Sequence, residues 1–407
     1  MIEPGNSLRP ILLILASTYP RWRGDTEPGF VHELARRLVD QFDVTVLCPH
    51  AKGAAREEVL DGVVVRRYRY ASDALETLVN DGGIITNLRR KKWKWLLVPS
   101  FFFAQWWALL QLCRRARPDV IHAHWLIPQG IIATFARTKI PIVVTSHGAD
   151  LFAMRASLFI WLRSRVLARA AAVTVVSHAM KTRLKIEHPE FDAQVKPMGV
   201  DFTTLFTPGA ERDRLSTCIL FVGRLVEKKG LIYLIEAMPR VLVKYPEANL
   251  DIIGFGPEYG RLAERVEALG IGSRVKFLGA IAQSQLPSHY RSAAVCVAPF
   301  VQARGGDQEG LGLVVVEAIA CHCPVLVGDV PAVHDLIDDD KGILLPQADV
   351  ATLANAIIAL LDNPQTAHDR VVQMRRQLQA RLSWTAVADE YAQLLHQAQQ
   401  KNSTMAE

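Results

Sequence analysis

Short apolar runs alternate with longer stretches of helical periodicity along most of the 407-residue chain. Val, Ile and Leu dominate runs such as 44–47, 142–145 and 219–222, and the stretch 231–244 is typical of the helical segments between them. Strands that are apolar on both faces and alternate with helices predict parallel sheets with helices on both sides. We therefore expect an α/β protein made of doubly wound sheets.

The alternating pattern occurs twice, which indicates two Rossmann-like domains. A length of 407 residues suits two domains, and the segment 196–209, rich in Pro and Gly, is the natural linker. The predicted boundaries are an N-terminal domain at 1–198, a C-terminal domain at 199–385, and a helix with a tail at 386–407. Ligands of doubly wound sheets bind beyond the carboxyl ends of the strands, so we expect a ligand site in a central cleft that both domains face.

The apolar run at 11–17 has two interpretations. It resembles the core of a signal peptide, but it is short, and Arg9 is the one basic residue before it. It runs directly into Thr18-Tyr19-Pro20. A first buried strand is the better interpretation.

Two glutamates, Glu309 and Glu317, are separated by seven residues that begin with a glycine-rich loop. From Leu313 onward the sequence favours a helix, and a helix N-terminus with free N–H groups favours a diphosphate. Continuous helix between the two carboxylates would separate them by about 12 Å along the axis. Carboxylates accept bonds from paired hydroxyls, so the pair suits the sugar and the ribose of a nucleotide sugar.

Two cations follow the predicted strand at 219–222. Arg224 and Lys229 come after Gly223, at the carboxyl end of this strand. A guanidinium and an ammonium there can neutralise a leaving diphosphate. This cation pair, followed about 85 residues later by the paired glutamates, is more specific than either motif alone.

On these motifs the chain resembles the family 4 glycosyltransferases, which have the two-domain GT-B fold. Glu309 to Glu317 matches the family's EX7E motif, and 223–230 matches its diphosphate-binding segment. The segments 253–257 and 275–279 match those that flank the base. The N-terminal segments 119–125 and 146–150 match the family's strand ends. The chain departs from the family in the loop after the first strand, where Gly24 alone matches a common Gly-Gly pair, and at Met198 and Leu311.

The resemblance implies roles for these residues. Glu309 would hold donor-sugar hydroxyls, Glu317 would hold the ribose, and Arg224 and Lys229 would stabilise the departing diphosphate. Members of the family retain the anomeric configuration and require no metal, so we expect no metal and no cofactor besides the nucleotide-sugar substrate. The predicted donor-binding residues are Gly223, Arg224, Lys229, Gly254, Gly256, Glu309, Gly310, Leu311, Gly312, Leu313 and Glu317.

In the N-terminal domain the resemblance places His147 beside the reacting centre. The predicted catalytic set is therefore His147, Glu309, Arg224 and Lys229. Gly24, His124 and Asp150 are candidates for the acceptor side or the cleft. We expect His122 and His124 to point to opposite faces of their strand, so that at most one of them faces the cleft.

The basic excess of the chain, a net charge of +6, is concentrated beside aromatic residues. The segment Arg89, Arg90, Lys91, Lys92, Trp93, Lys94 and Trp95 precedes an apolar stretch at 96–112 that contains Pro99, Ser100 and Gln105. A spanning helix needs about 20 cleaner residues, whereas basic flanks with Trp and Phe fit a segment that lies in a membrane interface. The alternative is a buried helix with a solvated basic cap. Nucleic acid is a poorer partner, because no recognised binding module accompanies the patch.

We therefore expect a cytoplasmic, peripheral membrane enzyme. It would move a hexosyl group from a UDP- or GDP-sugar to a lipid-linked glycan in polysaccharide or glycolipid assembly, with an anionic membrane surface as partner. Two alternatives stay open: a soluble enzyme that makes a small glycoside, and a nucleotide-sugar sensor without catalysis. The base, the sugar, the linkage and the oligomeric state also stay open.

Overall fold

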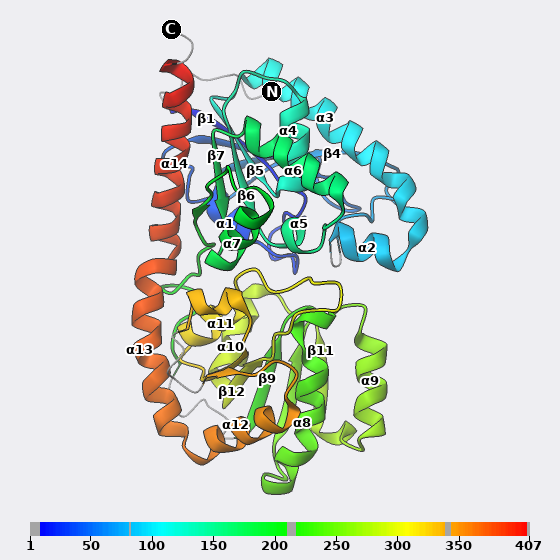
Figure 1. Cartoon of the computed structure of the whole chain (residues 1–407), viewed down its shortest axis with the longest axis vertical. Coiled ribbons are helices and arrows are strands. Elements are labelled where there is room, and N and C mark those ends of the chain that lie inside the picture. The colour runs from blue at the N-terminus through cyan, green and yellow to red at the C-terminus, as the bar shows by residue number, and fades with distance from the viewer. Residues whose placement is uncertain (1–8, 81–82, 210–216, 338–342, 405–407) are drawn as a thin grey trace. The chain divides into compact units, whose positions relative to one another are not determined.

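The chain forms two compact units and passes between them twice. The first unit comprises Met1–Gly199 and Trp384–Glu407, and the second comprises Val200–Ser383. The computed structural model describes residues 9–80, 83–209, 217–337 and 343–404 (Figure 1). The boundaries expected from sequence lie within two residues of these crossings. The C-terminal helix, expected as a segment of its own, groups with the first unit.

The sheet of the first unit has the strand order β3-β4-β2-β1-β5-β6-β7-β8. Neighbouring strands are parallel, apart from the antiparallel pair β3 and β4 at one edge. The run at 11–17 supplies β1, which lies between β2 and β5, so its interpretation as a buried strand is confirmed. The strands are β1 Ile11–Leu15, β2 Asp43–Pro49, β3 Glu57–Leu60, β4 Val63–Tyr68, β5 Val120–His124, β6 Ile142–Ser146, β7 Ala172–Val175 and β8 Gln194–Val195.

Helices cover this sheet, and one of them comes from the far end of the chain. The C-terminal helix α14 contacts α1, β5 and β6 (Figure 1). Its Tyr391 is fully buried, and its His396 ring stacks on Phe42 with the ring centres 4.5 Å apart. The helices of the unit are α1 Phe30–Ala35, α2 Ile84–Arg90, α3 Leu97–Ala116, α4 Ile131–Phe135, α5 Ala149–Phe152, α6 Ser157–Arg169, α7 His178–Glu187 and α14 Trp384–Thr404, with the short turns η1 Lys92–Leu96 and η2 Leu126–Gly130.

The second unit has a parallel sheet of order β11-β10-β9-β12-β13-β14. Its strand order reverses at β9, which lies between β10 and β12, and ligands of such sheets bind at this switch point. The doubly wound α/β class is thus confirmed in both units. The strands are β9 Cys218–Val222, β10 Asn249–Ile253, β11 Val275–Gly279, β12 Val295–Ala298, β13 Val325–Gly328 and β14 Leu344–Leu345.

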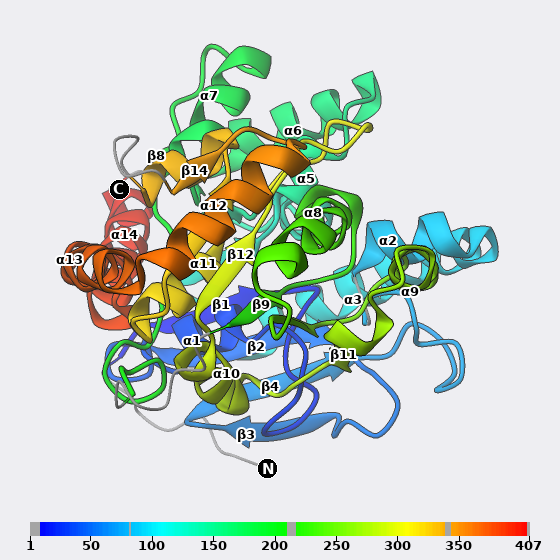
Figure 2. The ribbon, with the colours of Figure 1, turned by 90° about the horizontal axis from the view of Figure 1, so that it is seen from below.

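The core of the second unit follows from helical spacing. In α8, Leu231, Leu234, Ile235 and Met238 recur every three or four residues and are all buried. Burying side chains of this size contributes roughly 1.5–3 kcal/mol each. Figure 2 shows α8 beside α12, which it contacts. The helices are α8 Leu231–Lys244, α9 Tyr259–Ala268, α10 Leu286–Ser292, α11 Leu313–Ala320, α12 Val350–Asp362 and α13 Pro364–Leu382, with the 3-10 turns η4 Glu227–Lys229, η5 Gly272–Arg274, η6 Gln283–Gln285 and η7 Pro331–Asp335.

The segment expected at a membrane surface, 89–95, forms the end of α2 and most of η1, and α3 follows it. Among the described residues, Lys92–Ala116 is the one helix that could cross a membrane by length and composition alone. Phe101, Gln105 and Leu109 nevertheless form a buried stripe on α3, which contacts β2 and β4, and Tyr68 donates a hydrogen bond to Gln105. The helix is therefore part of the first unit.

One residue of this segment was wrongly assigned to the surface. Lys94 is buried, and its ammonium donates to the Thr77 carbonyl at 2.6 Å and to Asn87 Oδ1 at 2.8 Å. These polar partners compensate the cost of burying the charge. Trp93 and Trp95, on either side of Lys94, are exposed.

Candidate active site

The strand-end loops of the second unit approach one another at their backbones. A Cβ on Gly254 would lie 1.9 Å from the Gly223 carbonyl oxygen, and one on Gly256 would lie 2.3 Å from that of Leu225. The Leu225 amide donates to the Phe255 carbonyl at 2.9 Å. Gly254 and Gly256 thus allow the loop after β10 to lie against the loop after β9. Arg224 is half-buried in this second loop.

Lys229 and Glu309 form an ion pair between two of these loops. Lys229 ends the turn η4, and its Nζ lies 2.7 Å from Glu309 Oε2. The ammonium also lies 4.7 Å from the centre of the Phe300 ring, which attracts cations. Burial alone would raise the Glu309 pKa, but Lys229 and Lys228 outweigh burial and lower this pKa to about 2. Glu309 is therefore ionised at every pH at which the protein would work.

Lys228 has a different environment from its neighbour. It is buried, and its ammonium donates to Asp307 Oδ1 at 3.1 Å and to the Gln308 carbonyl at 3.0 Å. It thereby ties η4 to the segment just before Glu309. Sequence reasoning did not single out Lys228, because two adjacent lysines give no signal of which one is internal.

Glu317 lies in α11, behind the glycine-rich loop. Between Glu309 and Glu317 the helix begins only at Leu313. The separation of about 12 Å that a continuous helix would give the two carboxylates therefore does not apply. Glu317 is buried, and Tyr290 donates a hydrogen bond to its Oε2 at 2.9 Å. Burial raises the Glu317 pKa to about 7, against the opposing effects of Tyr290, Gln283 and Lys229. Gly310, Leu311 and Gly312 are buried between the two glutamates.

In the first unit, His147 follows β6 and is half-buried. Phe30 and Trp125 lie around it, with ring centres 4.9 Å and 5.0 Å from the imidazole. Its Nε2 is 2.9 Å from His124 Nδ1. Burial lowers the His147 pKa to about 3, so the ring is neutral near pH 7.

The expectation that His122 and His124 point to opposite faces was wrong. Their ring centres are 4.2 Å apart, and both side chains are fully buried. Successive strand residues alternate between faces, so residues two apart share one face. Both histidine side chains therefore lie on the same face of the sheet.

The candidates for the acceptor side differ in exposure. Asp150 is buried, and it accepts hydrogen bonds from the Leu126 amide at 2.6 Å and from Ser146 Oγ at 2.8 Å. Burial raises its pKa against these bonds. The Asp150 side chain thus links the loop after β5 to the end of β6 through buried hydrogen bonds. His124 makes a second link through the hydrogen bond between its ring and that of His147. Gly24 is exposed, and a Cβ there would meet no atom within 4 Å.

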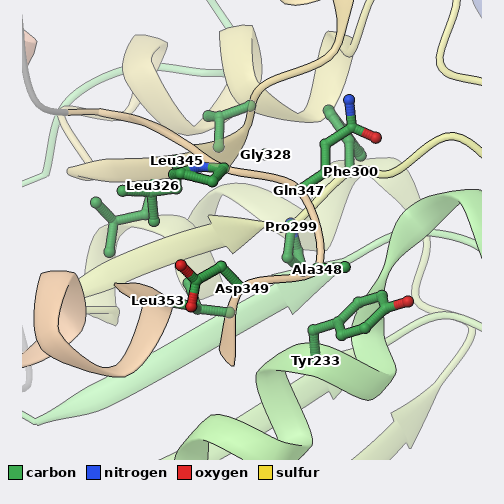
Figure 3. Close-up of a pocket in the computed structure, with 12 residues that line it drawn as sticks. Tyr233, Pro299, Phe300, Leu326, Gly328, Leu345, Gln347, Ala348, Asp349 and Leu353 are labelled. Carbon is green, nitrogen blue, oxygen red and sulfur yellow. The ribbon is translucent and has the colours of Figure 1, made fainter. Parts of the chain in front are cut away.

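Figure 3 shows a pocket of the second unit that Phe300 helps to line. It is lined by residues from α8, α12 and the ends of β12 to β14, including Tyr233, Gly328 and Gln347. The Gln347 amide is already bonded, because it accepts from the Gln302 amide at 2.8 Å and donates to the Asp329 carbonyl at 2.6 Å. We interpret it as a packing gap next to the candidate site.

One group in the described part of the chain combines residue types that bind metals. Ligand atoms of His50, Asp73 and Glu76 lie within 4.8 Å of one another. Arg69 pairs with Asp73 and, at 3.4 Å, with Glu76. A guanidinium already supplies the positive charge that these carboxylates need, so the group is an ion-pair network.

Two family models match the chain. The model described as Glycosyltransferase Family 4 matches residues 30–203, and the model described as Glycosyl transferases group 1 matches residues 211–377. The first match covers most of the first unit and ends just past its boundary at Gly199, and the second match lies within the second unit.

Two proteins with similar sequences are named as mannosyltransferases. A phosphatidyl-myo-inositol mannosyltransferase of Mycobacterium leprae is 31% identical over 281 residues, 67% of this chain and 71% of the relative. A GDP-mannose-dependent alpha-(1-6)-phosphatidylinositol monomannoside mannosyltransferase of Mycolicibacterium smegmatis is 26% identical over 396 residues, 94% of this chain and 98% of the relative. The solved structure of sucrose-phosphate synthase from Thermosynechococcus elongatus shares the fold, with a TM-score of 0.77, 22% identity, and coverage of 96% of this chain and 99% of its own.

Proposed function

Because the chain belongs to glycosyltransferase family 4 and is a hexosyltransferase that uses nucleotide sugars, we propose a more specific activity. The enzyme moves a hexosyl group from a UDP- or GDP-sugar to a lipid-linked glycan acceptor, with retention of the anomeric configuration and without a metal. It does so at the cytoplasmic face of a membrane, in polysaccharide or glycolipid assembly. The names of the two mannosyltransferases support a lipid-linked acceptor, and that of the Mycolicibacterium smegmatis relative ranks GDP-mannose first among the donors to test.

The ion pair of Lys229 and Glu309 carries this proposal. An ionised carboxylate 2.7 Å from an ammonium provides an acceptor for sugar hydroxyls next to a cation for the diphosphate. Lys229 and Arg224 then stabilise the charge that develops as the diphosphate leaves. Fixed cations of this kind act without reorganisation during the reaction, which is the task a metal ion performs in other transferases.

Glu317 completes the donor site on this proposal. Its second carboxylate oxygen accepts hydrogen bonds from the ribose, while Tyr290 holds the first at 2.9 Å. In the first unit, the neutral ring of His147 binds an oxygen of the substrate. The acceptor is bound by the first unit, with Gly24 in an exposed loop of that unit.

A surface of the first unit supports a membrane as partner. We call it the basic–aromatic surface, and it comprises Arg89, Arg90, Lys91, Lys92, Trp93, Trp95, Leu96, Phe103 and Trp107. Leu96 is 80% exposed and Phe103 64% exposed, which is high for large apolar side chains. Aromatic residues favour the membrane interface, and each Lys or Arg near an anionic surface adds about 1 kcal/mol.

Neighbouring helices continue this apolar exposure. The helix α4 contacts both α3 and α6. These helices also expose large apolar side chains, namely Phe135 of α4 and Leu158 and Trp161 of α6. The Arg165 guanidinium lies 5.2 Å from the centre of the Trp161 ring. An anionic bilayer matches this combination of exposed rings and arginines better than a purely aqueous environment.

The test of the proposed activity is a donor panel with EDTA present. GDP-mannose, UDP-glucose and ADP-glucose are compared by thermal shift and by slow donor hydrolysis. We expect one nucleotide to stabilise the protein, and we expect hydrolysis to disappear in Arg224→Ala but not in Arg240→Ala, which removes an exposed arginine of α8. Stabilisation without hydrolysis in the wild type would favour a sensor. Hydrolysis that required a divalent metal would contradict metal independence.

A further inference from the structure

Three histidines form a row at the carboxyl ends of β5 and β6. The rings of His124 and His147 are nearly parallel, at 8°, with centres 5.1 Å apart and Nδ1 and Nε2 at hydrogen-bond distance. The centre of the His122 ring lies 4.2 Å from that of His124. His124 is fully buried, so its hydrogen bond to His147 is shielded from water.

The two possible hydrogen bonds between His124 and His147 differ in cost. If His147 Nε2 donated, His124 would carry its own proton on Nε2. That nitrogen is buried, and among the described residues it has no hydrogen-bond partner. Buried N–H groups without an acceptor are rarer in proteins than buried acceptors without a donor, which indicates that the unpaired N–H is the costlier of the two. The cheaper arrangement has His124 Nδ1–H donating to His147 Nε2.

His122, whose ring neighbours that of His124, belongs to a polar chain. His122 Nε2 lies 2.7 Å from Thr145 Oγ1, which lies 2.7 Å from Thr174 Oγ1. Tyr391 of α14 lies close to both threonine hydroxyls and donates its own proton to the Lys196 carbonyl at 3.0 Å. His122 Nδ1 is buried and has no hydrogen-bond partner among the described residues, so the proton of His122 belongs on Nε2, which donates to Thr145.

We propose that His124 is a positioning residue that holds His147 as the neutral Nδ1–H tautomer. His147 then offers a hydrogen-bond donor to an oxygen of the substrate and does not act as a proton acceptor. This inference rests on the proposed function for the role of His147 towards a substrate, but the tautomer itself is a property of the free protein. Burial, which keeps the pKa of the His147 ring near 3, excludes the doubly protonated form near pH 7.

The tautomer is measurable by long-range ¹H–¹⁵N correlation on protein labelled with ¹⁵N-histidine. We expect the His147 pattern, assigned by its loss in His147→Ala, to show the proton on Nδ1 and to stay unchanged from pH 6 to pH 8. Wild-type His147 with its proton on Nε2, or with both nitrogens protonated, would overturn the proposal. This readout needs no activity, so it stands or fails independently of the transferase function.

Two variants of His124 separate positioning from packing. An Asn side chain places an amide nitrogen the same number of bonds from the backbone as His Nδ1, whereas Leu removes the donor. We expect His124→Leu to release His147 into a mixture of tautomers and to lower kcat roughly tenfold, the effect of one lost hydrogen bond of about 1.4 kcal/mol. His124→Asn should restore the Nδ1–H pattern and most of kcat. Equal His147 spectra in the two variants would contradict a positioning role.

Discussion

The ammonium of Lys229 lies 2.7 Å from Glu309 Oε2, and this contact joins the turn η4 to the loop that precedes α11. Both side chains are only slightly exposed, so their attraction is weakly screened. The loops that carry them are further tied together by Lys228 and its partner Asp307. The cation and the carboxylate are thus held in place before any ligand arrives.

Replacing Lys229 with Met should lower kcat by about 10²–10³-fold, because a fixed charge that stabilises the leaving group is lost. Initial rates with the best donor of the panel would measure the effect. Lys244→Met is the matched control, since Lys244 forms an exposed ion pair with Asp362 at the C-terminal end of α8. A loss of similar size in both variants would point to general destabilisation.

Donor binding should depend on pH through Glu317. Below pH 7 the free protein holds a proton on this carboxyl, because its pKa is raised to about 7. Hydroxyl donors from a ribose favour the ionised form, so binding releases the proton. Donor affinity should therefore rise with pH, by at most about tenfold per unit below pH 7, and level off above it. Calorimetry between pH 5.5 and pH 8.5 would show the slope.

In Glu317→Gln that slope should vanish, because an amide does not titrate. Glu309→Gln is a second comparison. The Glu309 pKa of about 2 places its titration outside the range, so the slope should persist in that variant. An unchanged slope in Glu317→Gln would show that another group titrates.

Gly254→Ala should destabilise the second unit by several degrees in Tm. The new Cβ would lie 1.9 Å from the Gly223 carbonyl oxygen, and the φ of +138° is one that Ala rarely adopts. Backbone strain of this kind costs at least about 1–3 kcal/mol. Gly260→Ala is the control, since its Cβ would meet no atom within 4 Å and Ala favours the helix α9. A scanning calorimetry trace with equal Tm in both variants would refute the close approach.

Exchanging Trp95, Phe103 and Trp107 for Ser should abolish flotation with vesicles that contain anionic lipid. Flotation of the wild type should also weaken as salt is raised, because the basic residues act through screened charges. Val243→Ser removes an 85% exposed apolar residue of the second unit and should float like the wild type. If the wild type never floats, the soluble alternative replaces the membrane-associated one.

Periodicity and residue type predicted the elements that carry the site. Uninterrupted apolar runs marked most of the buried strands, and Gly223, Arg224 and Lys229 follow a strand as expected. The pairing of Glu317 with Tyr290, 27 residues earlier, had no sequence signal, because it depends on how α10 packs against α11. The ring of Phe300 beneath Lys229 was missed for the same reason.

Two errors have local physical causes. Lys94 lies in a run of basic residues, and composition alone does not show that one turn of η1 directs it towards Thr77 and Asn87. His122 and His124 share a face because a strand repeats every two residues, which the sequence already implied. The first error needs tertiary information to correct, and the second needs only the correct period.

The helix α14 has a consequence for the order in which the protein is made on the ribosome. It follows the entire second unit in the chain, yet it covers β5 and β6 and supplies Tyr391 to the polar chain behind His122. While the second unit is being translated, Phe42 and the hydroxyls of Thr145 and Thr174 therefore lack their final neighbours. The first unit begins folding first, but its histidine row gains its last support only when α14 has left the exit tunnel.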